Sequence, residues 1–327
     1  MRKRPFGTTR FMAAEIGLGC WQLGGNDWGS LDEKSAFEIL AAALAAGVNF
    51  LDTADVYGDG RSETLIGRFL KSRAEEVFVA TKLGRTAELY PDYYTEEAIR
   101  AATEASLARL GVEALDLTQL HCVPTEVLRR GEVFGWLRKL RDEGKIKHFG
   151  ASVESMEEAL LCLEQDGLTS LQIICNIFRQ KPVSTLFAQA RERGVALIVR
   201  LPLASGLLTG KWTTQSEFAE SDHRHFNRDG QFFNVGETFA GLPFEQGVAL
   251  ADALKPSVPA GWTMSQMAQR WILDHDAVSV VIPGASRPEQ ARANAAVSDL
   301  PPLPGELHTR LREFYLAEVA PHIRGPY

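Results

Sequence analysis

Short hydrophobic runs bounded by turn-forming residues recur eight times along this chain. Most of the runs are almost continuously apolar, which is typical of parallel β-strands that are covered on both faces. The predicted strands are Ile16–Leu18, Asn49–Thr53, Val77–Lys82, Leu115–His121, Lys147–Ser152, Ser170–Cys175, Ala196–Leu201 and Ser279–Pro283.

Segments with the helical spacing of apolar residues lie between most of these runs. In one of them Ala36, Ile39, Leu40 and Ala43 fall on a single helical face. In others a glycine stands directly after the last periodic residue, as helix ends favour. The predicted helices are Glu33–Ala46, Thr95–Leu110, Phe134–Glu143, Ser155–Gln165, Ser184–Arg193, Met264–Asp274, Pro288–Val297 and an extra C-terminal helix within residues 300–319.

Strand and helix alternate with short turns, which predicts a parallel sheet with right-handed crossovers. Eight such units fit an α/β fold of the (β/α)8 TIM barrel type, with residues 1–327 as a single domain, better than an open doubly wound sheet. The sequence Gly17-Leu18-Gly19 does not continue with the spacing of a GxGxxG motif, which argues against a Rossmann fold. The stretch from Pro202 to about Trp262 predicts a long loop after strand 7, and loops of this length are usually functional.

The net charge and the hydropathy of the chain limit the functions that it can have. The net charge of −7 disfavours a nucleic acid partner, because a phosphate backbone requires a strongly positive surface. The most apolar stretch, Ile39–Leu51, is too short to span a bilayer, and the basic N-terminus is not followed by the apolar region of a signal peptide. A cytoplasmic protein without membrane contact is therefore expected.

Metal-ligand types occur, but not in a convincing arrangement. The four cysteines (Cys20, Cys122, Cys162 and Cys175) show no CxxC spacing, which favours a role as small buried hydrophobic residues. The sequence Asp222-His223-Arg224-His225 has no further ligands at suitable spacing, so we predict no metal site.

Four polar or ionisable side chains lie at successive strand ends, where barrel enzymes place their active sites. Asp52 and Tyr57 follow the second strand, Lys82 ends the third, and His121 ends the fourth. Each residue alone could have a structural role, but together they suit carbonyl reduction. A lysine beside a phenol is expected to lower the pKa of the phenol, a carboxylate keeps the lysine charged, and a histidine can orient the carbonyl oxygen.

Three separated motifs, in this order, resemble the aldo-keto reductase superfamily over nearly the whole chain. Asn49–Gly58, continued by Arg61-Ser62-Glu63 and Gly67, is similar to the second-strand signature of the family. Leu203–Lys211 is similar to the loop that clasps the cofactor diphosphate, and Ile282–Gln290 with Asn294 is similar to the segment that binds the adenosine end. The Pro-Gly-Ala turn at Pro283 resembles the bacterial branch of the family.

The resemblance implies roles by position. Asp52, Tyr57, Lys82 and His121 would form the catalytic tetrad, with Tyr57 as the acid in reduction and the base in oxidation. The preferred cofactor would be NADPH, with NADH possible, and Arg287 would meet the 2′-phosphate of NADPH. The residues expected to bind the cofactor are Ser152, Gln172, Arg200, Leu203, Ser205, Gly206, Leu208, Lys211, Gly284, Ser286, Arg287, Gln290 and Asn294.

This chain also departs from the family pattern. Val153 stands where many members have an asparagine, and Arg200 ends the seventh strand, where many members stack an aromatic ring on the nicotinamide. A flat guanidinium could stack in the same way and, through its charge, disfavour the oxidised cofactor. Alternatively, Arg200 turns away from the ring and pairs with an acid.

The expected activity is NADP(H)-dependent reduction of aldehydes or ketones, with a small carbonyl compound or alcohol as the substrate. Trp21 and Trp28 follow the first strand and are expected to line the substrate pocket. Two alternatives stay open: a redox-sensing regulatory subunit like the potassium-channel β subunits of the family, and a barrel that binds sugar phosphates without redox chemistry. The individual substrate, the physiological direction and the oligomeric state are not predicted.

Overall fold

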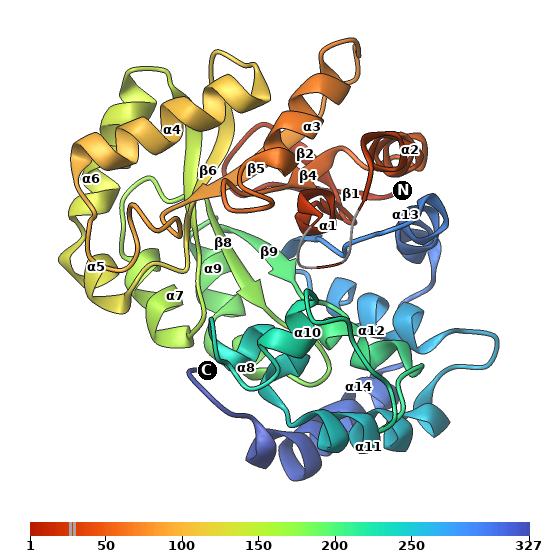
Figure 1. Ribbon diagram of the computed structural model, residues 1–327. Helices are drawn as coiled ribbons and strands as arrows, with labels where there is room; N and C mark the ends of the chain where they lie inside the picture. Colours follow the sequence, from red (N-terminus) through yellow and green to blue (C-terminus); the bar gives the residue numbers. More distant parts are fainter. Residues whose placement is uncertain (26–27, 29–30) are drawn as a thin grey trace.

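Eight parallel strands form a barrel in the computed structural model, which describes residues 1–25, 28 and 31–327 (Figure 1). The strands follow one another in chain order, and bridges from Ile16 to Val281 and from Gly19 to Gly284 join the first strand to the last. The predicted TIM barrel is therefore confirmed. The strands are β3 (Leu18–Gly19), β4 (Phe50–Asp52), β5 (Phe78–Leu83), β6 (Leu115–His121), β7 (Ile146–Ser152), β8 (Ser170–Ile174), β9 (Ala196–Arg200) and β10 (Val278–Val281).

Helices surround the barrel and mostly match the predicted segments (Figure 1). The observed helices are α1 (Trp21–Gly24), α2 (Glu33–Ala45), α3 (Arg61–Leu70), α4 (Glu96–Leu110), α5 (Thr125–Arg130), α6 (Glu132–Asp142), α7 (Met156–Leu163), α8 (Lys181–Thr185), α9 (Phe187–Glu192), α12 (Met264–Leu273) and α13 (Pro288–Ala295). Two differences stand out. Helix α3 was not predicted, because only a narrow apolar stripe interrupts its polar sequence. The predicted helix Ser184–Arg193 is instead α8 and α9, separated at Leu186, whose φ of −120° is not helical.

A hydrophobic plug closes the amino-terminal end of the barrel. The hairpin of β1 (Lys3–Pro5) and β2 (Met12–Ala14), which was not predicted, carries Phe6 into the barrel. The ring of Phe6 lies 5.3 Å from that of Phe50 and 5.2 Å from that of Phe78, at the first residues of β4 and β5. Only the carboxyl end of the barrel is therefore left to form a cavity.

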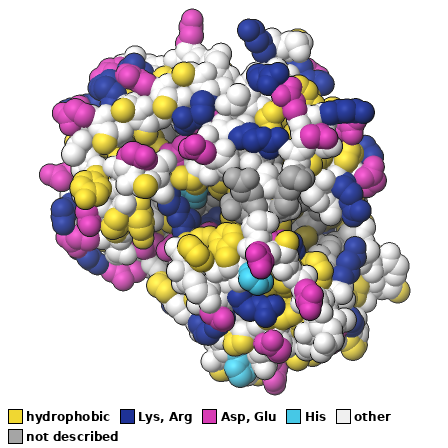
Figure 2. Space-filling view, viewed as in Figure 1, with side chains coloured by type: hydrophobic (Ala, Val, Ile, Leu, Met, Phe, Trp, Pro, Cys, Tyr) yellow, Lys and Arg dark blue, Asp and Glu magenta, His cyan; other side chains and the backbone are white. Residues whose placement is uncertain are grey.

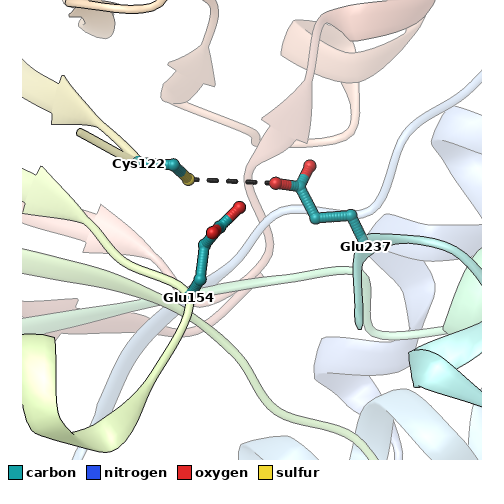
Figure 3. Close-up of side chains that lie close together, drawn as sticks. All are labelled: Cys122, Glu154 and Glu237. Atoms are coloured by element: carbon teal, nitrogen blue, oxygen red, sulfur yellow. Dashed lines mark hydrogen bonds between the residues drawn. The ribbon is translucent and has the colours of Figure 1, made fainter. Parts of the chain in front are cut away.

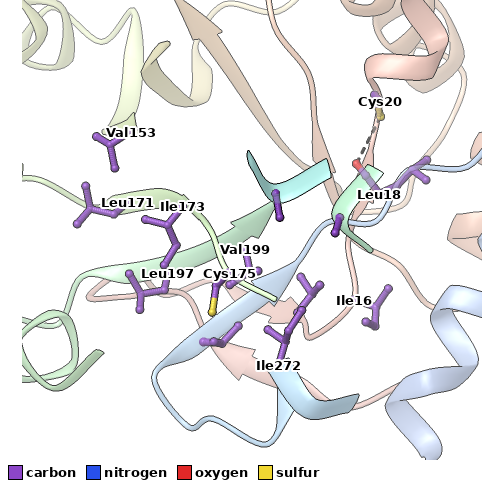
Figure 4. Packing of buried hydrophobic residues seen from close by; sticks show 14 of the residues in the cluster. Ile16, Leu18, Cys20, Val153, Leu171, Ile173, Cys175, Leu197, Val199 and Ile272 are labelled. Carbon is purple, nitrogen blue, oxygen red and sulfur yellow. Dashed lines mark hydrogen bonds between the residues drawn. The ribbon is translucent and has the colours of Figure 1, made fainter. Parts of the chain in front are cut away.

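The main core lies between the strands and the surrounding helices. Figure 4 shows part of it, with Leu171 and Ile173 of β8 beside Leu197 and Val199 of β9. These four side chains are fully buried. Burial of apolar surface contributes about 25 cal/mol per Å² to the stability of the fold. Packing in this layer therefore holds the strands in place, and with them the polar residues at the strand ends.

The long connection after β9 is a packed structure rather than an open loop. It contains η1 (Ala204–Thr209), α10 (His223–Phe226), η2 (Val235–Glu237) and η3 (Phe239–Gly241) before helix α11 (Phe244–Leu254). The buried guanidinium of Arg179 donates to the carbonyls of Ala240 and Pro326, and Arg324 donates to the carbonyl of Gly241. The connection is thus fastened to the barrel and to the C-terminal segment.

The extra C-terminal helix is confirmed in a shorter form than residues 300–319. Helix α14 (Gly305–Phe314) begins after Pro304 and continues as a π-helical turn, Tyr315–Val319. Among the described residues, no helix is both long enough and apolar enough to cross a lipid bilayer.

Candidate active site

A cavity of about 750 Å³ opens at the carboxyl ends of the strands. Figure 2 shows a hollow near the middle of this face, with Lys or Arg side chains inside it. Most of the predicted site residues line this cavity, although they are spread from position 21 to position 290 of the chain. Those that line it are Trp21, Trp28, Asp52, Tyr57, His121, Gln172, Arg200, Leu203, Ser205, Gly206, Lys211, Gly284, Ser286, Arg287 and Gln290.

Four predicted residues lie behind the cavity wall. Lys82, Ser152 and Leu208 are almost fully buried. The side-chain amide of Asn294 donates to the carbonyl of Gly284, at 3.2 Å. These residues can position the wall, and in this structure they do not form its surface.

Lys82 is the centre of a buried polar cluster, here called the lysine cluster. Its Nζ lies 2.5 Å from Oδ1 of Asp52, 2.8 Å from the carbonyl oxygen of Thr53 and 3.1 Å from the hydroxyl of Tyr57. The other carboxylate oxygen of Asp52 accepts from Gln172 at 2.6 Å. The lysine ammonium is therefore held between a carboxylate and the phenol.

The strand register explains why these side chains meet. In the pairing of β4 with β5, Phe50 lies opposite Phe78 and Asp52 lies opposite Ala80. Side chains alternate between the two faces of a strand, so Asp52 and Lys82 point into the barrel as Phe50 and Phe78 do. Lys82 is two residues beyond Ala80, and its long stem brings the ammonium to the carboxylate.

The protonation state of the phenol differs from the simple expectation. Burial raises the pKa of Tyr57, and the nearby Lys82 lowers it without outweighing burial. The net pKa is therefore raised, and Tyr57 rests in its protonated form. Burial also brings the pKa of His121 well below its usual value, so the imidazole is neutral. Its ring meets that of Tyr57 nearly edge-on, with the centroids 5.9 Å apart.

A second charged group, here called the arginine–glutamate cluster, lies in the same cavity. It consists of Arg85, Glu154, Arg200 and Glu237, of which the sequence analysis selected only Arg200. The carboxylate of Glu237 lies 3.0 Å from the Arg85 guanidinium and 3.4 Å from that of Arg200. Arg85 also lies 3.6 Å from Glu154. Arg200 therefore pairs with an acid while its side chain also lines the cavity.

The two carboxyl groups of this cluster differ in charge. Burial and, after it, the adjacent Glu237 raise the pKa of Glu154 to about 8. Burial also acts to raise the pKa of Glu237, but the Arg85 and Arg200 guanidiniums outweigh it, so that this pKa lies well below its usual value. Near neutral pH, Glu237 carries the negative charge and Glu154 is mostly protonated.

Cys122 lies beside these carboxyl groups, and Figure 3 shows its sulfur directed toward Glu237. Ligand atoms of Cys122, Glu154 and Glu237 all lie within 4.8 Å of one another, which is close enough to hold a metal ion. However, the two guanidiniums already pair with the carboxyl groups and would repel a cation. In the segment Asp222-His223-Arg224-His225, where no metal site was predicted, the Asp222 carboxylate pairs with Arg224 at 2.5 Å.

Aromatic rings also line the cavity. Trp21 stacks on Tyr57 with ring centroids 5.8 Å apart, and Trp28 meets Trp21 at 5.5 Å. Phe233 lies 6.3 Å from Trp21 and beneath the Arg85 guanidinium. The cavity is therefore lined by both aromatic and charged side chains, which meet where Arg85 lies over Phe233.

Comparison with known proteins decides the family. The model of the aldo/keto reductase family matches residues 15–316 of the chain. This protein belongs to the aldo/keto reductase family. The aldo-keto reductase YhdN of Bacillus subtilis is 30% identical over 297 residues, which cover 89% of this chain and 86% of the relative. The NADH-specific methylglyoxal reductase of Escherichia coli is 29% identical, covering 92% and 94% of the two chains.

Solved structures agree with the assignment. The aldo-keto reductase AKR11C1 of Bacillus halodurans, in its holo form, superposes with a TM-score of 0.78 at 27% identity and covers 96% of both chains. The glycerol dehydrogenase AKR11B4 of Gluconobacter oxydans superposes with a TM-score of 0.77 at 28% identity, covering 99% and 97%. The chain is therefore an NAD(P)H-dependent oxidoreductase with a TIM barrel fold.

Sequence reasoning about this aldo-keto reductase missed three members of the arginine–glutamate cluster. Arg85 and Glu154 follow strand ends directly, so the rule that selected Lys82 and Ser152 could have found them. Glu237 carries no such signal, because it belongs to the connection after β9. Gln172, expected at the cofactor, lines the cavity and donates to Asp52.

Proposed function

We propose that residues 1–327 act as one barrel that reduces small aldehydes or ketones with NADPH, and that Tyr57 donates the proton. One observation carries this proposal: the Tyr57 hydroxyl lies in a cavity that can admit a carbonyl compound, 3.1 Å from a lysine that Asp52 keeps charged. His121 is beside it as a neutral ring that can hold the carbonyl oxygen.

The residues along the cavity are suited to a dinucleotide. The loops that begin at Ser205 and Gly284 are lined by glycines where a side chain would collide with Trp212 or Gln22. Buried donors in the wall, Trp212 Nε1 and Arg200 Nε, have no hydrogen-bond partner among the described residues. The amino terminus of α13 adds a partial positive charge next to Arg287, which favours a phosphate group.

The reaction then divides between the bound cofactor and the protein. When bound, the cofactor supplies a hydride to the carbonyl carbon. Tyr57 gives its proton to the carbonyl oxygen as negative charge develops there, and Lys82 stabilises the phenolate that remains. Asp52 holds the lysine ammonium in place, and neutral His121 donates a hydrogen bond to the same oxygen. In the reverse direction, the phenolate of Tyr57 accepts the proton of an alcohol.

Cofactor choice depends on Arg287, which lines the adenosine end of the cavity. A guanidinium matches phosphate oxygens, so NADPH is expected to bind more tightly than NADH. Arg287→Ala should weaken NADPH binding about tenfold or more while leaving NADH binding nearly unchanged. Arg292→Ala is the matched control, because Arg292 lies on the same helix and pairs with Glu289. Equal binding of both cofactors by the wild type would contradict this preference.

The direct test is a panel of carbonyl substrates followed by cofactor absorbance, with NADPH and with NADH. Methylglyoxal belongs in the panel, and glycerol, which is an alcohol, is tested in the reverse direction with NADP⁺ and NAD⁺, because relatives are named for these compounds. Rapid NADPH oxidation with at least one small aldehyde or ketone is expected. Tight cofactor binding with slow turnover of every compound would instead favour the regulatory alternative, and no binding of either cofactor would exclude both.

A further inference from the structure

The arginine–glutamate cluster has an unbalanced charge. Two guanidiniums face one ionised carboxylate, because Glu154 is mostly protonated near neutral pH. The cluster therefore carries a net charge of about +1 inside a largely buried cavity, where charges act over longer distances than in water. Neither Tyr57 nor His121 belongs to this cluster.

Glu237 is held where it contacts both arginines. Its residue is 5% exposed, and its backbone carbonyl accepts from the hydroxyl of Ser205 at 3.2 Å. The same hydroxyl accepts from the backbone amide of Phe239 at 3.1 Å. The segment around Glu237 is thereby attached to the loop after β9, and the carboxylate is fixed between Arg85 and Arg200.

The field of the cluster reaches the reaction position. Burial is the main cause of the shifted pKa values of Tyr57 and His121. Among the cluster residues, Arg85 lowers the pKa of His121, Glu237 raises it, and Arg200 lowers the pKa values of both Tyr57 and His121. The ring that exchanges a hydride must lie within bonding reach of the carbon whose oxygen contacts Tyr57. A charge that acts on Tyr57 and His121 therefore also acts on that ring.

We propose that the net charge of the arginine–glutamate cluster sets the relative affinity for oxidised and reduced cofactor, and that Glu237 is the residue that limits this charge. The inference rests on the proposed function. The nicotinamide ring is positive when oxidised and neutral when reduced, so each added positive charge nearby weakens binding of the oxidised form alone. Glu237 acts through the arginines and is a positioning residue.

The test requires that Glu154 cannot ionise when its neighbours are removed. All variants are therefore built on Glu154→Gln, which keeps a neutral side chain and the same cluster charge as the wild type. Adding Arg200→Met lowers the cluster charge by one, and adding Glu237→Gln raises it by one. Adding both substitutions restores the charge of the parent and serves as the matched control.

The readout is the ratio of the dissociation constants of NADP⁺ and NADPH, measured by isothermal titration. Relative to Glu154→Gln, the ratio should rise about tenfold with Glu237→Gln and fall by a similar factor with Arg200→Met. The triple variant should return to the parent ratio. If the double variant Glu154→Gln/Glu237→Gln does not fold because of its added positive charge, the parent, the Arg200→Met variant and the charge-balanced triple variant still test the dependence on charge.

Three results separate the inference from the proposed function. Binding of both forms with the same ratio in all variants would overturn the inference alone, as would a triple variant that departs from the parent as far as the double variants do. Failure of the wild type to bind either form would instead contradict the proposed function.

Discussion

The lysine cluster and the arginine–glutamate cluster lie in one cavity but are built from different parts of the chain. Asp52 and Lys82 come from neighbouring strands, and their register makes them meet. Glu237 comes from the connection after β9 and reaches Arg85 and Arg200 across the barrel mouth. The lysine cluster is thus built from the strands, whereas the arginine–glutamate cluster also needs Glu237 from the connection after β9.

Burial also differs between the clusters. The Lys82 and Asp52 side chains are 1% and 3% exposed, whereas those of Arg85 and Glu154 are both 19% exposed. Removing one partner of a fully buried ion pair leaves an uncompensated charge in the protein interior, which is costly. In the partly exposed arginine–glutamate cluster, an unpaired charge can be compensated by water or by a change in the protonation of Glu154. Substitutions in this cluster are therefore expected to be less destabilising than substitutions in the lysine cluster.

Lys82→Met should have the largest effect. Loss of the ammonium leaves the phenol without the charge that stabilises its ionised form, so kcat should fall about 10²–10⁴-fold. Arg85→Met removes a cation from the other cluster and should lower kcat by no more than about tenfold, because Arg85 acts only through space. Steady-state kinetics of both variants, with circular dichroism as a check of folding, tests whether the two clusters differ in this way. Equal losses would contradict this difference.

The two carboxyl groups should be coupled in stability. When Glu237→Gln removes the ionised carboxylate, Glu154 can ionise and take over the pairing with Arg85. The double variant Glu154→Gln/Glu237→Gln loses this substitute, so its destabilisation should exceed the sum of the single effects by about 0.5–3 kcal/mol. Urea unfolding of the four proteins measures the difference. Strictly additive effects would show that the carboxyl groups do not share this role.

The smallest expected effect is on the pH dependence of stability. The pKa of Glu154 is raised to about 8 in the folded protein from 4.5. The stability that it contributes is therefore fully present below its unfolded pKa and is lost as the pH rises toward about 8. Glu154→Gln should lose less stability than the wild type over this range, which corresponds to about 1–3 °C in Tm.

Melting curves between about pH 5 and pH 8 measure this difference. Burial also raises the pKa of Asp55, to about 7, but Asp55 is present in both proteins and affects them alike. Parallel melting profiles would mean that Glu154 does not hold its proton in the folded state.

The local pattern of apolar and polar residues was enough to predict much of the fold. Apolar runs indicated all eight strands, and their ends differ from the observed ones by no more than two residues. The position of Lys82 at a strand end was enough to place it near Asp52 and Tyr57. In each case the information lies within one strand or between neighbouring strands, where the alternation of side chains fixes direction.

Features that depend on distant contacts were not predictable. The hairpin that carries Phe6 has strands of three residues each, and its place in the barrel depends on Phe50 and Phe78. The partner of Arg200 is 37 positions away along an irregular connection, as the numbering shows. The pKa of Tyr57 rises because the whole site is buried, which the nearby lysine alone did not indicate.

The central claim is that Tyr57 donates the proton in a nicotinamide-dependent reduction. The most direct measurement is kcat of Tyr57→Phe with the best substrate of the panel, together with the dissociation constant for NADPH. We expect kcat to fall about 10²–10⁴-fold while NADPH binding stays close to that of the wild type, because the substitution removes only a hydroxyl. Turnover near that of the wild type would contradict the claim.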